Sequence, residues 1–128
     1  MSDVGEVLTG TAMIALGSGA AVQASDAYGG AMMTVAGLLG LLSAQEAERA
    51  AAWRAADIAA MRALLPDAAV APATDLTLTA LDVEWAALSD ALIAHHAAVE
   101  AAGDIAQDRA ILQFYRESAA RREFLWPQ

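Results

Sequence analysis

The residues best suited to chemistry are two adjacent histidines, His95 and His96, with Glu100 four positions after His96. Imidazole nitrogens and carboxylate oxygens bind zinc and iron, and bundle metal sites draw such ligands from facing helices. Glu46 and Asp108 can contribute further ligands if their helices face His95. These residues define a hypothetical metal site, which would make the chain a metal carrier or a metal-dependent bundle enzyme.

A simpler interpretation is that the histidines are structural and bind no cofactor. The chain contains no Glu-x-x-His motif of the kind that builds di-iron centres. Adjacent side chains on a helix point about 100° apart, so one ion does not readily bind both His95 and His96. We therefore favour His95 as a hydrogen-bonded residue at the edge of a core and His96 as exposed.

Composition excludes certain catalytic sites and argues against nucleic-acid binding. The chain has no cysteine and no lysine, so a cysteine nucleophile and a lysine-containing phosphate loop are both excluded. We predict no catalytic residue. The net charge of −9 repels phosphate backbones, and we expect no nucleic-acid partner.

The elements that would position these residues are helices. Alanine, the best helix former, occurs 35 times among 128 residues, and strand formers never alternate cleanly. The sequence predicts helices over residues 3–24, 26–65, 80–102 and 105–123, with a loop over 66–79. We expect one all-α domain spanning 1–128, resembling a four-helix bundle, with an apolar N-terminal hairpin rich in Gly and Ala and a C-terminal hairpin.

Several residues are typical of helix ends. Ser25 or Asp26 is suited to cap the second helix, Thr79 the third and Asp104 the fourth. The capping-box pattern Ser43–Glu46 allows a break within 26–65, and then Glu46 and Arg49 would lie at a helix start. We favour one continuous or kinked helix, because no proline interrupts it.

Apolar spacing predicts which faces are buried in the C-terminal hairpin. Between residues 80 and 102 the 4-3 spacing predicts a packing seam on one face, and between 105 and 123 an apolar set lies on one side. The seam comprises Leu81, Trp85, Leu88, Leu92, His95, Val99 and Ala102, and the set on the last helix comprises Ile105, Leu112, Tyr115 and Ala119.

The most unusual feature of the chain is that residues 7–45 carry a single charged side chain, Asp26. Such a segment needs cover from the fold, from a protein partner or from lipid. We expect protein to cover it, in a homodimer, in a larger homo-oligomer or against a helix of another protein. The predicted interface comprises Tyr28, Met32, Val35, Leu39, Leu42 and Trp126.

Membrane insertion is the alternative to protein cover. Residues 7–25 and 27–45 are each close to the length that spans a bilayer, but only about a third of each is Ile, Leu, Met, Val or Phe. Asp3 and Glu6 give the start the wrong charge for a secretion signal. We therefore predict a cytoplasmic, non-enzymatic helical protein that acts by association, encoded by a GC-rich bacterial genome.

Overall fold

A computed structural model describes residues 3–126, which form four helices and no strand. The helices are α1 (Val4–Val22), α2 (Ala27–Leu64), α3 (Leu78–Ala102) and α4 (Ile105–Arg121), each bound within two residues of its predicted position. The all-α prediction is confirmed. The chain clusters into two compact units, one formed by the residues up to Arg49 with those from Phe124 onward, the other by Ala50–Glu123. That residues 1–128 form one domain stays a prediction.

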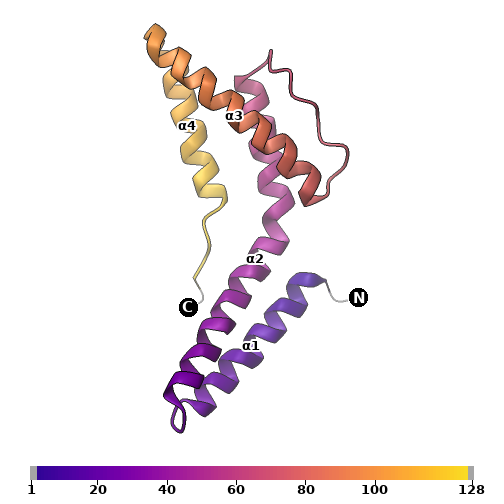
Figure 1. Cartoon of the computed structure of the whole chain (residues 1–128), viewed down its shortest axis with the longest axis vertical. Coiled ribbons are helices and arrows are strands. Elements are labelled where there is room, and N and C mark those ends of the chain that lie inside the picture. Colours follow the sequence, from indigo (N-terminus) through magenta and orange to yellow (C-terminus); the bar gives the residue numbers. More distant parts are fainter. Residues whose placement is uncertain (1–2, 127–128) are drawn as a thin grey trace. The chain divides into compact units, whose positions relative to one another are not determined.

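The first unit contains the predicted N-terminal hairpin, in which α1 runs antiparallel to the first part of α2 (Figure 1). Asp3 caps α1 by accepting a hydrogen bond from the Glu6 amide at 2.7 Å. In the turn between the helices, Asp26 accepts one from the Gly29 amide at 2.9 Å. Asp26 thus acts as the predicted cap of α2.

The second helix is continuous from Ala27 to Leu64. Of the two alternatives for this segment, the single helix is therefore the one observed. Ser43 lies inside α2, so the capping-box interpretation of Ser43 and Glu46 was wrong. Glu46 and Arg49 are half-buried helix residues.

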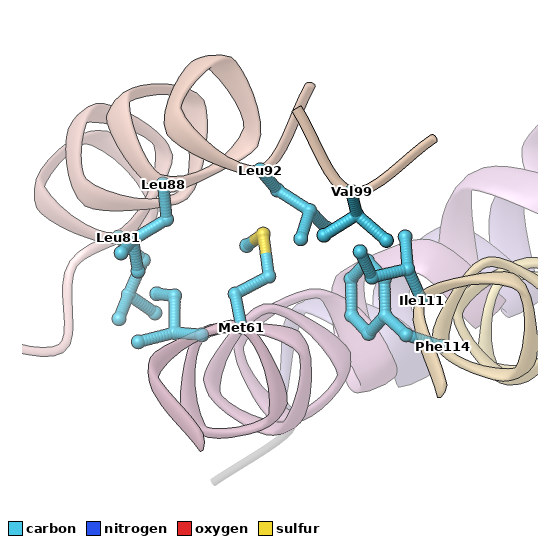
Figure 2. Close-up of a cluster of buried hydrophobic side chains, with 8 residues drawn as sticks. Met61, Leu81, Leu88, Leu92, Val99, Ile111 and Phe114 are labelled. Atoms are coloured by element: carbon cyan, nitrogen blue, oxygen red, sulfur yellow. The ribbon is translucent and has the colours of Figure 1, made fainter. Parts of the chain in front are cut away.

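The second unit contains a core formed by three helices, shown in Figure 2. The predicted seam of α3 supplies half of this core, and Leu88 and Leu92 are almost completely buried. Thr77, not Thr79, caps α3, since its side chain accepts a hydrogen bond from the Ala80 amide. The core comprises Ile58, Met61, Leu81, Leu88, Leu92, Val99, Ile111 and Phe114.

The buried face of α4 differs from the predicted one. Ile111, Phe114 and Ser118 are buried, whereas Ile105 and Leu112 are at least half exposed. The tight connection explains the difference. Gly103 ends α3 in the left-handed conformation (φ 69°), and Asp104 caps α4 at once through the Gln107 amide, so α4 has little freedom to rotate.

A completely buried carboxylate, that of Asp57, joins the three helices of this unit. One oxygen accepts hydrogen bonds from Trp85 Nε1 (3.2 Å) and Ser118 Oγ (2.6 Å). The other accepts one from Arg121 Nε at 2.8 Å. Because α2, α3 and α4 each contribute to this network, it fixes their register.

A second buried carboxylate, Glu84 of α3, holds the loop that precedes its own helix. It accepts hydrogen bonds from Arg62 Nε and from the Ala73 amide, both at 2.7 Å. Arg62 also donates to the Val70 carbonyl at 3.0 Å. The loop between α2 and α3 is therefore tied to both helices by polar contacts.

Replacing Asp57 with alanine should destabilise this unit strongly, because the guanidinium of Arg121 would lose its buried partner. We expect the Asp57→Ala variant to lose about 3–5 kcal/mol of unfolding free energy. Guanidinium unfolding followed by tryptophan fluorescence measures this loss. The matched control is Asp90→Ala on the exposed side of α3, which should change stability by less than about 0.5 kcal/mol. Equal losses in the two variants would contradict a register-fixing role.

Candidate functional site

The contact between α1 and the first part of α2 is made largely by small residues. A Cβ atom added to Gly30 would lie 2.7 Å from the Gln23 Cα atom and 2.9 Å from the Gly19 carbonyl oxygen. One added to Gly37 would lie 3.0 Å from the Ala12 carbonyl oxygen. The two backbones therefore approach closely at positions where glycine has no side chain.

Several large apolar side chains of this hairpin lie away from the contact, although Leu16 packs into it, with its Cγ atom 2.6 Å from a Cβ added to Gly37. At 100° per residue, Val7 and Ile14 lie opposite the face of α1 that carries Ala12 and Gly19. The exposed stripe of α2 lies opposite Gly30 and Gly37 in the same way. The outward apolar surface, as we call it, therefore covers opposite sides of the hairpin and comprises Val4, Val7, Met13, Ile14, Tyr28, Met32, Val35 and Leu39, all about half exposed or more.

The uncharged segments of the two helices lie side by side, and their ends coincide. A Cβ at Gly5 would lie 3.8 Å from the Ala44 carbonyl oxygen, and Glu6 and Glu48 line one groove at this end. At the other end the charge is Asp26, in the turn. The hairpin is thus an apolar segment bounded by carboxylates at both ends.

Both helices of the hairpin are long and apolar enough to cross a membrane. In the most apolar windows of α1 and α2, only 11% and 17% of the residues are buried. The core helix of a water-soluble protein would be mostly buried. Within the described residues, most of the surface of this hairpin is therefore not buried by other parts of the chain.

The structure places five of the six predicted interface residues on exposed surfaces. Tyr28, Met32, Val35 and Leu39 form the α2 part of the outward apolar surface, Trp126 is exposed, and Leu42 is half-buried. The C-terminal tail belongs to the first unit, where the Leu125 backbone exchanges two hydrogen bonds with the Gln45 side chain (2.6 and 2.9 Å). That these residues form an interface stays a prediction.

The histidine candidates lie in the second unit, where α3 faces α4. His96 Nε2 is 2.9 Å from Asp108 Oδ1, and one ligand atom from each of His96, Glu100 and Asp108 lies within 4.8 Å of the others. The Tyr115 ring packs against the imidazole with 5.6 Å between ring centroids. Burial raises the pKa of Tyr115, and the negative charge of Glu100 raises it further.

The other two predicted metal ligands are not in this group. His95 Nε2 instead contacts Gln107 Oε1 at 3.2 Å, and Glu46 belongs to the first unit. His96 was expected to be exposed, but its side chain is only 16% exposed because α4 lies over it. Asp108, named as a possible ligand from sequence, is the carboxylate that joins His96 and Glu100.

Sequence reasoning missed the buried carboxylates Asp57 and Glu84. A signal was present in both cases, since each lies on an apolar stripe. Asp57 lies four positions before the buried Met61, and Glu84 lies midway between Leu81 and Leu88. An acid on a core stripe indicates a buried polar network, because an unpaired buried charge would be too costly.

Comparison with known protein families, curated proteins and solved structures finds no match to this chain.

Adding a methyl group at Gly30 should separate the two helices of the hairpin, because the group would clash with backbone atoms. The chain has no cysteine, so a cysteine pair at positions 5 and 44, where a Cβ at Gly5 would lie 3.8 Å from the Ala44 carbonyl oxygen, reports on the contact through the rate of disulfide formation. We expect Gly30→Ala to slow this cross-linking several-fold. The control is Gly17→Ala, where nothing lies within 4 Å of the added atom and the rate should not fall. Equal rates in the two variants would contradict the close approach.

Proposed function

We propose that the N-terminal hairpin is a membrane anchor and that the chain is a non-enzymatic protein displaying its helical second unit at a bilayer surface. The observation that carries this proposal is the outward apolar surface on opposite sides of the hairpin. This proposal reverses the preference for protein cover that we drew from sequence alone. It rests on the direction in which the large side chains point.

The free energy gained by covering the outward apolar surface is comparable to the stability of a small protein. Burying one large apolar side chain is worth about 1.5–3 kcal/mol. The eight large side chains of the outward apolar surface are about half to three-quarters exposed, so the total is on the order of 10 kcal/mol, comparable to the 5–15 kcal/mol that stabilises a typical domain. We therefore infer that this surface is covered in the functional state.

Lipid fits this surface better than one partner protein does. A two-fold dimer covers one side of a hairpin, whereas hydrocarbon covers all sides. The 19 residues of α1 give a helix of about 28 Å, close to the thickness of the bilayer core. Contact through small residues is also the usual packing of helices in membranes, where apolar burial does not drive association.

The distribution of arginine favours one orientation. All seven arginines follow Glu46, and Arg49, Arg54 and Arg62 lie within 20 residues of the uncharged part of α2. Arginine near the end of a membrane span favours the cytoplasmic side. We therefore propose that the second unit faces the cytoplasm, in agreement with the localisation predicted from sequence.

The test is flotation of the full chain with lipid vesicles. We expect the wild-type protein to float with the vesicles and to resist extraction by salt and alkali. The double variant Ile14→Asp with Leu39→Asp should remain in the soluble or aggregated fraction, because each Asp near a span centre costs about 2.5–3.5 kcal/mol.

The matched control is Val83→Asp with Ile93→Asp. These two side chains are equally apolar and exposed, but they lie on α3. The control should float like the wild type. A wild-type protein that stays in the supernatant without detergent would contradict anchoring, as would equal losses from the two double variants.

Self-association through α2 is the second candidate function. The exposed residues Tyr28, Met32, Val35 and Leu39 follow the 4-3-4 spacing of helices that pack along a seam. Trp126, at the exposed end of the tail, adds an anchor of the kind enriched in protein interfaces. These observations support a homodimer or larger oligomer, or packing against a helix of another protein.

Substituting Met32 with aspartate should dissociate such an assembly, because it places a charge in the middle of the stripe. We expect the wild-type chain to be at least dimeric by sedimentation or light scattering, and the Met32→Asp variant to be monomeric. The measurement is made with and without detergent, with Ile93→Asp as control. A wild-type chain that is monomeric in plain buffer would contradict both candidate functions.

A further inference from the structure

We propose that His96, Glu100 and Asp108 form a binding site for a divalent transition-metal cation, with Zn²⁺ as the best-suited ion. This site lies in the second unit, so it does not depend on what covers the hairpin. Of the residues considered from sequence, His96, Glu100 and Asp108 belong to this site, and His95 and Glu46 do not.

The positions of the three ligands follow from the two helices that carry them. His96 and Glu100 are four residues apart on α3 and therefore lie on one face, one turn apart. Asp108 comes from the first turn of α4, and its oxygen already lies 2.9 Å from His96 Nε2. With ligands at about 2.0–2.1 Å from the ion, a tetrahedral site separates ligand atoms by about 3.4 Å. Rotation of the exposed Glu100 side chain, together with widening of the His96–Asp108 distance by about 0.5 Å, would bring the group to that spacing.

The negative charge of the three ligand side chains and their few present contacts also favour binding of a cation. A hydrogen bond between His96 and Asp108 uses one carboxylate only. The Glu100 side chain makes no hydrogen bond or ion pair with any other described residue, although its charge raises the pKa of Tyr115. A neutral imidazole with two carboxylates carries a charge of −2, which a divalent ion neutralises. Imidazole with carboxylate oxygens is a ligand set that Zn²⁺ accepts, and its fourth position remains open to water.

The surroundings hold the site in place without closing it. The Tyr115 ring lies against the imidazole, and the left-handed Gly103 with the Asp104 cap fixes α4 against α3. The His96 side chain is 16% exposed and that of Asp108 is 32% exposed. An ion can therefore enter from solvent, and its nitrogen ligand is already oriented.

The experiment is a titration of the full chain, purified without a histidine tag, with Zn²⁺ alone. Calorimetry measures affinity and stoichiometry, and Co²⁺ as a spectroscopic substitute reports coordination by its visible absorption. We expect one ion per chain. Removing any one of the three ligands, in His96→Ala, Glu100→Gln or Asp108→Asn, should weaken binding at least about 10-fold.

The matched control is His95→Ala, which removes a neighbouring imidazole that contacts Gln107 instead. It should leave the affinity unchanged. Far-UV circular dichroism confirms that each variant keeps its helices, and Asp108→Asn preserves the shape of the side chain. Fewer than about 0.1 ions per chain at saturating Zn²⁺ would overturn the proposal, as would equal losses from His96→Ala and His95→Ala.

Discussion

The close contact between α1 and the first part of α2 is the constraint on which the rest of the first unit depends. Gly19, Gly30 and Gly37 lie in that contact, so the two backbones approach closely there, and the Leu16 side chain packs against Gly37. Large apolar side chains on the opposite faces, such as Ile14 and Leu39, remain exposed. The hairpin therefore leaves apolar surface uncovered within the described residues.

The second unit is packed differently from the first, because large side chains lie between its helices. Large side chains such as Leu88, Leu92 and Phe114 fill the space between helices, and the polar residues that share this space are satisfied. Asp57 receives donors from two other helices, and Glu84 receives a side-chain donor and a loop amide. Such networks contribute specificity of packing because only one register pairs every group. This unit is built to be rigid, which suits the presentation of a site on its surface.

The candidate metal site on α3 and α4 depends on how these two helices pack against each other. Rotating α4 to bury Ile111 and Phe114 also turns Asp108 toward His96 and places Tyr115 against the imidazole. The predicted rotation, with Leu112 and Ile105 inward, would have placed a different set of polar residues opposite the histidines. The core of this unit and its candidate metal site are therefore set by the same rotation.

The sequence by itself determined the helices, their ends and the separation of an uncharged segment from an amphipathic one. These features depend on local effects, namely alanine content and caps such as Asp26 and Asp104. Tertiary structure alone decided which face of α4 is buried, which carboxylates are enclosed, and which residue completes the group around His96. In an alanine-rich helix several faces are almost equally apolar, so periodicity does not choose between them. The choice is made by contacts between residues distant in sequence, such as Asp57 with Ser118 and His96 with Asp108.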